Sequence, residues 1–456
     1  METGTEPLIA HLKDVFLDLA AHPYPEVANP PTAPRRASVA LILRIQPHYS
    51  HWPAARTKHA HAPSHGHQRR RSSAASNPDK KLELKDILDA FFAQDWVKHG
   101  DPELLFIKRA TRAGDNWNGH VALPGGKRDP EDEDDQVTAV REAMEEVGVD
   151  LSYAHAIAIG NLPQRVVTTS WGKVPLMVLC PYIFLLTSPS IPPLRLQPTE
   201  VASTHWVSLR ALLSPAQRTF EYADVSKRLA KSELGIKRWF LQSMLSQMMF
   251  AAVRLLPSES TYCSSIPGFI PELEDSAGVI GSIKGWWTGD TAATTTQKPL
   301  LLWGLTLGVI SDLLEHIPPH KAMDMWTYPT FTSWDVRITL WAMSYRFRKQ
   351  KAIEMGQAAE IPAGTEENMK VPKQDPQGMP VEEEPGEVGI GGLGVGRHWG
   401  RSRRDALGSR GSAVNSMLEG YYPIVRKAVA TALVGRISVT ALLLAYAWSR
   451  YSKVRK

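Results

Sequence analysis

Two adjacent glycines followed by an acidic, glutamate-rich segment constrain this chain more than any other feature. The stretch reads GGKRDPEDEDDQVTAVREAMEEVGV and covers 125–149. A helix over 134–147 places Glu142, Glu145 and Glu146 at positions i, i+3 and i+4, so their carboxylates share one helix face. The glycine pair permits a tight turn in front of that helix. The sequence therefore predicts a strand end held against an acidic helix face.

Three carboxylates on one helix face favour a metal-dependent phosphate chemistry. Their mutual repulsion raises their pKa values unless a divalent cation lies among them. Mg²⁺ takes oxygen ligands of this kind, neutralises a diphosphate and lowers the pKa of an attacking water. A solvated acidic helix is the alternative, because glutamates at this spacing are common on exposed helices. The joint pattern of double glycine, acidic loop and glutamates favours the metal site.

The same stretch closely resembles the Nudix box, which has a glycine, five residues, a glutamate, seven residues and then REUxEExGU, where U is a bulky aliphatic residue. Gly126 opens the box here, and Asp132 occupies the first acidic position. The second half is matched by Arg141, Glu142, Glu145, Glu146, Gly148 and Val149. Eight residues rather than seven separate Asp132 from Arg141. This lengthening and the GGKRDP sequence resemble the coenzyme A diphosphatase branch of the family.

Sequences outside the box resemble the same branch over 36–320. They are GHVALP at 119–124, Glu200-Val201 and WGLT at 303–306. The chain departs from the branch at three points. Gly-His-Val stands where the branch usually has Gly-Gln-Val, the branch's histidine before that glycine is absent, and the spacing from Arg109 is one residue longer. The resemblance is therefore closer for the catalytic class than for the substrate.

The resemblance implies a role for each matched residue. The catalytic and metal-binding set is Glu142, Glu145 and Glu146, which would hold Mg²⁺ or Mn²⁺ while one of them passes a proton to or from water. Arg141 would orient a neighbouring carboxylate through a bidentate pair. The motif loop is Gly125, Gly126 and Asp132.

Basic residues near the end of the second strand are candidates for substrate binding. Lys108, Arg109 and Arg112 would receive the phosphates, although a solvated strand edge explains such a cluster equally well. Glu200 is a further candidate base or metal ligand, and a surface role at the start of a helix is equally open.

These features predict an α/β fold, a Nudix α/β/α sandwich with a mixed β-sheet, large insertions, a disordered linker and a C-terminal helix. Strands are expected over 37–46 and 103–109, a helix over 236–255, and a strand and helix from Leu300. The expected organisation is an N-terminal helical segment over 1–35, the Nudix hydrolase domain over 36–320 with insertions at about 47–101 and 218–298, a helical extension over 321–348, a disordered linker over 349–412 and a transmembrane anchor over 428–449.

The expected reaction is Mg²⁺-dependent hydrolysis of a diphosphate linkage in coenzyme A or a derivative. One alternative keeps the enzyme but makes its substrate a nucleoside diphosphate derivative. Another is a non-catalytic, membrane-tethered module with a Nudix fold, against which the intact glutamate set argues.

Composition narrows the expected partners and compartment. Lys and Arg total 52 against 47 Asp and Glu, a small excess that does not indicate a nucleic-acid partner. Cys180 and Cys263 have no CxxC spacing, which fits a reducing compartment. The acidic N-terminal sequence does not resemble a secretory signal. We expect an intracellular protein with a cytosolic catalytic domain; its organelle, its oligomeric state and the role of the histidine-rich insertion stay open.

The segment 428–449 is apolar except for Arg436 and is followed by a basic end. Its 22 residues reach about 33 Å, enough for a hydrocarbon core of ~30 Å. Arg436 in the middle costs roughly 2.5–3.5 kcal/mol, which nearly cancels the gain from the apolar residues. A transmembrane anchor is the prediction, with a docked or interfacial helix as the alternative.

Overall fold

β1 (Arg36–Gln46) runs through the middle of the main sheet because its sequence, RASVALILRIQ, is an apolar and β-branched run that is buried along its length. It pairs in parallel with β7 (Pro175–Leu186) and antiparallel with β2 (Asp101–Arg109) and β4 (Gly125–Lys127). The strands predicted over 37–46 and 103–109 are confirmed. The sheet is mixed, and its strands follow the order β11 (Pro257–Tyr262), β8 (Val201–Ser208), β2, β1, β7 and β5 (Ala156–Asn161).

The structure, a computed structural model, describes residues 5–31, 35–48, 83–111, 119–168, 175–223, 247–263, 299–317, 326–360, 417–418 and 420–454. The remaining elements of these ranges are α1 (Thr5–Ala21), α2 (Leu84–Phe92), α3 (Asp95–Lys98), β3 (Val121–Ala122), α4 (Asp135–Val147), β6 (Arg165–Thr168), α5 (Leu209–Leu213), the 3₁₀ turn Pro215–Gln217, β9 (Arg218–Ala223), β10 (Met248–Arg254), β12 (Leu301–Trp303), α9 (Gly304–Glu315), β13 (Thr330–Phe331), α11 (Trp334–Glu360) and α14 (Tyr421–Val454).

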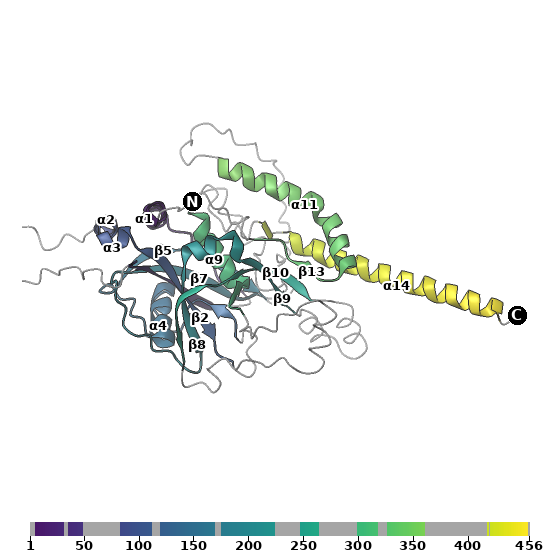
Figure 1. Ribbon diagram of the computed structural model, residues 1–456, viewed down its shortest axis with the longest axis horizontal. Coiled ribbons are helices and arrows are strands. Elements are labelled where there is room, and N and C mark those ends of the chain that lie inside the picture. Colours follow the sequence, from purple (N-terminus) through teal and green to yellow (C-terminus); the bar gives the residue numbers. More distant parts are fainter. Residues whose placement is uncertain are drawn as a thin grey trace, which may run out of the picture.

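Helices cover both faces of the main sheet (Figure 1). On one face α4 packs Ala139, Ala143 and Val147 against Ile42 and Ile107. On the other face a larger apolar cluster gathers α1, α2, α9 and β10. The alternation of side chains along the strands divides each strand between these two clusters. The predicted α/β/α sandwich with a mixed sheet is confirmed.

A second, four-stranded sheet forms part of the larger cluster. β10 lies at its centre and pairs antiparallel with β9, β12 and β13. The predicted helix over 236–255 is therefore wrong over Met248–Arg254, because a short apolar run fits a buried strand as well as a helix and the partner strands decide between them. The strand and helix expected from Leu300 are confirmed as β12 and α9.

The N-terminal helix belongs to the main core. Leu12, Phe16 and Leu19 of α1 are fully buried. The expected boundary between 1–35 and the domain that begins at residue 36 does not separate two packing units. The described part of the predicted insertion over 218–298 is integrated in the same way, since β11 extends the edge of the main sheet beside β8.

The region after α9 differs from the expected extension and linker. β13 precedes the helix α11, which continues to Glu360 instead of ending at 348. The expected linker begins too early because 349–360, KQKAIEMGQAAE, consists almost wholly of strong helix formers. The rest of that expected linker, 361–412, lies outside the described residues.

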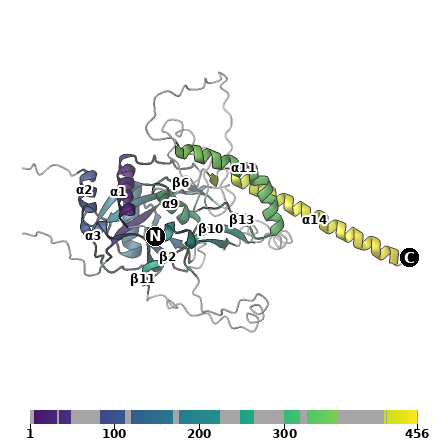
Figure 2. The ribbon, with the colours of Figure 1, turned by 45° about the horizontal axis from the view of Figure 1, so that its top comes forward.

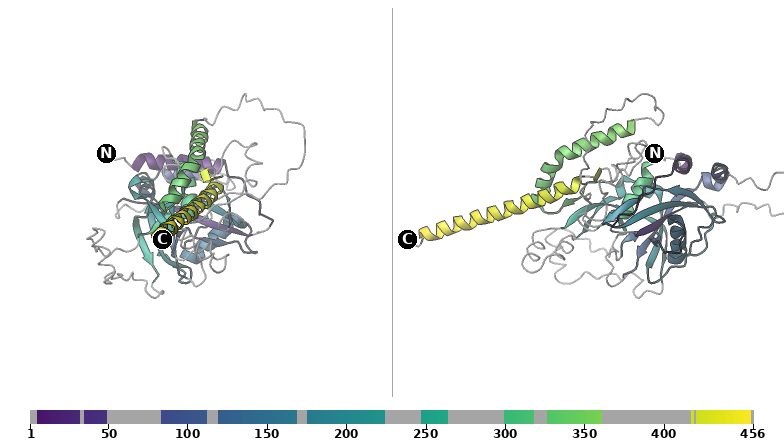
Figure 3. Two further views of the ribbon diagram at one scale, coloured as in Figure 1. Left: turned by 90° about the vertical axis from the view of Figure 1, so that its right-hand side faces the viewer. Right: turned by 180° about the vertical axis from the view of Figure 1, so that it is seen from behind.

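α14 begins inside the body of the protein and extends away from it (Figures 1 and 3). Tyr421, Tyr422, Val425, Ala428 and Val429 on its first turns are buried in the larger cluster. The later apolar residues are exposed, for example Leu442 at 70% and Leu444 at 66%. The segment expected as a free anchor over 428–449 is thus the continuation of a docked helix.

Candidate active site

α4 is fixed at both ends by its own sequence. The side chain of Asp134 accepts a hydrogen bond from the N–H of Val137 at 2.7 Å, which caps the first turn. Gly148 ends the helix in the left-handed conformation, with φ of 72°. The predicted helix over 134–147 is confirmed. These caps fix which helix face turns toward the sheet.

The glycine pair brings β4 against both β1 and α4. At Gly125, where φ is 152°, a Cβ would stand 2.2 Å from the carbonyl oxygen of Ser38. At Gly126 a Cβ would stand 2.4 Å from a carboxylate oxygen of Glu142. Gly125 is therefore needed for the packing of the strands, and Gly126 leaves the volume that the Glu142 carboxylate fills.

Three carboxylates converge at this edge of the sheet. Glu142, Glu146 and Glu200 each offer an oxygen, and these oxygens all lie within 4.8 Å of one another. Glu200 comes from the segment before β8, and its carbonyl oxygen accepts a hydrogen bond from the N–H of Ala110 at 2.8 Å. The pairing of β8 with β2 therefore carries Glu200 to α4.

Burial destabilises the negative charge of these glutamates. Glu146 is 1% exposed, and one of its carboxylate oxygens accepts a hydrogen bond from the N–H of Gly125 at 2.8 Å. Burial raises the pKa of Glu146 to about 8, more than that hydrogen bond lowers it. Burial also raises the pKa of Glu142, against the opposing effect of Arg141. The glutamates are crowded and desolvated, as carboxylates are where a cation shares the site.

The donor set fits a hard divalent cation. All three groups are carboxylates, which are ligands that Mg²⁺ and Mn²⁺ accept in proteins. A cation among them would offset both the burial and the mutual repulsion of the negative charges. Glu142, Glu146 and Glu200 are the residues that would hold it.

Arg141 ties the acidic loop to the helix. Its Nε and Nη2 donate to the two carboxylate oxygens of Asp132, each at 3.0 Å, a bidentate pair. Its Nη1 donates to Glu142 at 3.1 Å and to Glu145 at 3.0 Å. Asp132 also accepts from the hydroxyl of Thr138 at 2.9 Å. The Arg141 guanidinium holds the pKa of Asp132 well below its usual range.

Glu145 lies at the rim of the site rather than in the group of three. Its side chain is 58% exposed, and its carboxylate accepts from Arg141. The shared helix face predicted for the three glutamates therefore holds, but the structure joins Glu200 to Glu142 and Glu146. In the sequence, Glu200 was marked only by the Glu200-Val201 pair. That pair did not indicate that Glu200 lies close to α4.

The predicted basic residues do not act together. Arg109 lies on the α4 side of β2, and its charge opposes the rise in the pKa of Glu146. Lys108 points to the opposite side, where it contributes to a lowered pKa of His205. Arg112 lies outside the described residues. Arg109 is thus the predicted basic residue whose charge reaches the glutamates.

Two segments distant in the sequence meet beside Arg109. The rings of His120 and Trp303 have centroids 5.0 Å apart. The N–H of Arg109 donates to the carbonyl oxygen of His120 at 3.0 Å, and the hydroxyl of Thr306 donates to the carbonyl oxygen of Val121 at 3.3 Å. The sequence landmarks at 119–124 and 303–306 therefore contact each other beside the backbone of Arg109.

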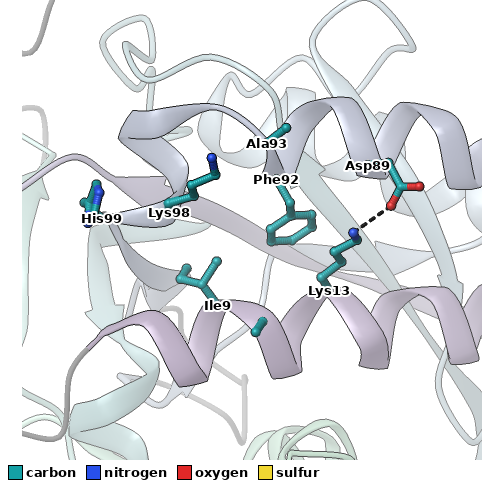
Figure 4. A pocket seen from close by; sticks show the side chains of 8 residues that line it. Ile9, Lys13, Asp89, Phe92, Ala93, Lys98 and His99 are labelled. Carbon is teal, nitrogen blue, oxygen red and sulfur yellow. Dashed lines mark ion pairs between the residues drawn. The ribbon is translucent and has the colours of Figure 1, made fainter.

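A groove of about 490 Å³ lies elsewhere, between α1 and the pair α2 and α3 (Figure 4). Ile9 and Phe92 form its apolar floor, and the ion pair between Lys13 and Asp89, at 2.7 Å, crosses one end. Since α1 and α4 cover opposite faces of the sheet, this groove is separate from the three glutamates.

Comparisons with known proteins agree with the geometry of the site. The NUDIX domain matches residues 96–229. The "Uncharacterized protein C14C4.10c" of Schizosaccharomyces pombe is 34% identical over 261 residues, which cover 56% of this chain and 70% of that protein.

Two shorter matches are with proteins whose names state an enzymatic class. The "Mitochondrial coenzyme A diphosphatase NUDT8" of Mus musculus is 43% identical over 56 residues, 12% of this chain and 27% of that enzyme. "Nudix hydrolase 15, mitochondrial" of Arabidopsis thaliana is 34% identical over 93 residues, 20% of this chain and 31% of that enzyme. The chain thus spans about a third or less of these two relatives. Among solved structures, the NUDIX domain of Shewanella oneidensis NrtR complexed with ADP ribose has 15% identity and a TM-score of 0.22, over 39% of this chain and 74% of that one.

Proposed function

The chain belongs to the Nudix family, and we propose that it hydrolyses the diphosphate linkage of coenzyme A or a coenzyme A derivative, with Mg²⁺ or Mn²⁺ as its metal. As a Nudix pyrophosphohydrolase it uses a divalent metal and acts on a small-molecule diphosphate. The observation that carries the proposal is the convergence of Glu142, Glu146 and Glu200 within 4.8 Å, next to Arg109.

Each residue of the site has a separate role in hydrolysis. A divalent cation bound here would neutralise the diphosphate and lower the pKa of the attacking water. Glu142, Glu146 and Glu200 would hold the cation, and one of them would take the proton of the water. Arg109 offers its guanidinium to a phosphate oxygen. Arg141 donates a hydrogen bond to Glu142 and keeps its carboxylate in place. Asp132 in turn fixes the Arg141 guanidinium.

Glu145 is a candidate for a further ligand of the cation. It is one turn from Glu142 on the same helix face, and its carboxylate is exposed. To reach the cation, its carboxylate would have to give up its pair with Arg141. We therefore keep Glu145 as a ligand that joins from the rim.

Coenzyme A is the preferred substrate class for two reasons. The GGKRDP sequence and the segments 119–124 and 303–306, which contact each other, resemble the coenzyme A diphosphatase branch. The aligned mouse relative also carries that activity in its name. The alternative substrate is a nucleoside diphosphate derivative, which the same acidic group would cleave.

The test is a comparison of substrates on the full chain in detergent, because the first turns of α14 are part of the core. Coenzyme A, ADP-ribose and a dinucleoside polyphosphate are each incubated with Mg²⁺, with the Glu146→Gln variant as control. We expect 4′-phosphopantetheine and adenosine 3′,5′-bisphosphate from coenzyme A by mass spectrometry. A far higher specificity constant for one of the other two substrates would favour the alternative.

We also propose that α14 anchors the protein in a membrane, with the catalytic domain in the cytosol. Residues 421–453 form a helix long and apolar enough to span, with a mean hydropathy of 1.9 in its most apolar window. Alkaline carbonate extraction tests the anchor. The full chain should stay with the membrane, and a chain ending at Arg436 should be released while its docked turns remain. Release of the full chain would refute the anchor.

A further inference from the structure

One face of α11 exposes large apolar side chains in a single stripe. Trp334, Ile338, Trp341 and Tyr345 are 74%, 59%, 59% and 52% exposed. Their spacing of four, three and four residues keeps them on one side of the helix. The opposite side carries the buried residues Val336, Leu340 and Ser344. The stripe is therefore not the side that packs on the protein.

α11 begins beside the point where α14 leaves the body (Figures 1 and 2). Nη2 of Arg436 donates to a carboxylate oxygen of Asp335 at 2.6 Å, and Nε of Arg436 donates to the other oxygen. The charge that makes a membrane span costly is thus paired with a carboxylate on the first turn of α11. The start of α11 stands at the same level along α14 as Arg436.

The length of α14 sets where a bilayer would begin. Ala432 is still buried in the body, so 433–449 is the apolar stretch that remains. At 1.5 Å per residue it reaches about 25 Å, which is shorter than a hydrocarbon core of ~30 Å. A span over 433–449 would therefore have to begin as soon as α14 leaves the body, within one turn of Arg436, where the stripe of α11 also starts.

The charges around the stripe suit a lipid surface. Arg337 and Lys349 are exposed and border the stripe along α11. Tryptophan and tyrosine prefer the boundary between headgroups and hydrocarbon, and exposed cations are attracted to anionic lipids. An exposed aromatic stripe with basic borders is the composition of a helix that lies in that boundary.

We propose that the exposed face of α11 is a second membrane-contact surface, which lies in the headgroup region of an anionic bilayer beside α14. The proposal rests on the anchor proposed above. It makes α11 the element that sets how closely the catalytic domain approaches the bilayer.

The test uses single cysteines carrying an environment-sensitive fluorophore. The two native cysteines are buried, so labelling is specific to an introduced exposed site. Trp341→Cys reports on the stripe, Leu444→Cys on α14 and Tyr153→Cys on the body, where Tyr153 is 81% exposed. The full chain is reconstituted into vesicles of phosphatidylcholine and phosphatidylserine, with and without brominated lipid.

We expect brominated lipid to quench the probes at 341 and 444 several-fold more than the probe at 153. Replacing phosphatidylserine by phosphatidylcholine should reduce quenching at 341 and leave it unchanged at 444. Quenching at 444 alone would overturn the α11 surface and leave the anchor standing, whereas quenching at neither position would refute both. A blue-shifted but unquenched probe at 341 would indicate contact with a second copy and would also overturn the proposal. Hydrolysis of coenzyme A in the same vesicles tests the catalytic proposal separately.

Discussion

The carboxylate of Glu142 fills the space that a side chain on Gly126 would need, with one of its oxygens 2.4 Å from the position of that missing Cβ. The neighbouring Gly125 meets backbone instead, since its Cβ would stand 2.2 Å from the carbonyl oxygen of Ser38. One glycine therefore shapes the site, and the other shapes the sheet.

Alanine at these two glycines should separate activity from stability. In Gly126→Ala the flexible Glu142 side chain has to move, so we expect loss of most hydrolysis with a small change in the free energy of unfolding. In Gly125→Ala the backbone of β1 has to move, and the positive φ adds strain, so we expect about 2 kcal/mol or more of destabilisation. Urea unfolding and turnover of coenzyme A measure the two effects. Equal loss of stability in both variants would contradict the assignment.

Removing a charged ligand should reduce hydrolysis while the fold stays intact. We expect Glu146→Gln to lower kcat about 100-fold to 1000-fold, which corresponds to about 3–4 kcal/mol of transition-state stabilisation. Glu145→Gln should raise the Mg²⁺ concentration that gives half-maximal activity, because it removes a ligand at the rim. Glu131→Gln in the exposed part of the loop is the control. Unchanged turnover of Glu146→Gln at saturating Mg²⁺ would refute the metal site.

The pair between Asp132 and Arg141 should stabilise the protein at neutral pH. Because the pKa of Asp132 is lowered in the folded protein, its contribution is present above about pH 4 and is lost as the pH falls toward the folded value. We expect Asp132→Asn to cost about 2 kcal/mol at pH 7. The difference between the two proteins should shrink below about pH 4 in urea unfolding. A difference that stays constant down to pH 3 would show that the charge is not its source.

His205 should make stability fall between pH 7 and pH 5. Its ring nitrogens lie 2.8 Å from the hydroxyls of Ser203 and Ser260, and burial lowers its pKa to about 4, with a smaller contribution from Lys108. In the unfolded chain His205 is protonated as the pH falls through about 6.5, whereas in the folded protein it stays neutral down to about pH 4. The free energy of unfolding is therefore highest above pH 6.5 and declines below it. We expect a loss of about 2 kcal/mol from pH 7 to pH 5.

The control for that decline is His205→Gln, which offers hydrogen bonds but does not titrate. All other histidines are common to both proteins, so the difference between the two pH profiles isolates His205. Parallel profiles would contradict the lowered pKa, and NMR titration of the imidazole checks it directly.

The helix that carries the glutamates was determined by the sequence alone. Asp134 and Gly148 cap it, and the 3.6-residue period puts Glu142, Glu145 and Glu146 on one face. Helical geometry is local, because each hydrogen bond joins residues four apart. The strands β1 and β2 were equally readable, since an unbroken β-branched run leaves few alternatives.

The tertiary structure alone decided which carboxylates meet. Glu200 reaches α4 through the register of β8 on β2, and no local period encodes a contact between strands so distant in the chain. The same holds for β10, whose apolar run became a strand only because β9, β12 and β13 offered hydrogen-bond partners. The apolar sequence of α14 does not indicate how much of the helix is buried against other elements. Packing against the body buried its first turns and left the rest exposed, because burial depends on neighbours that the sequence of one helix does not specify.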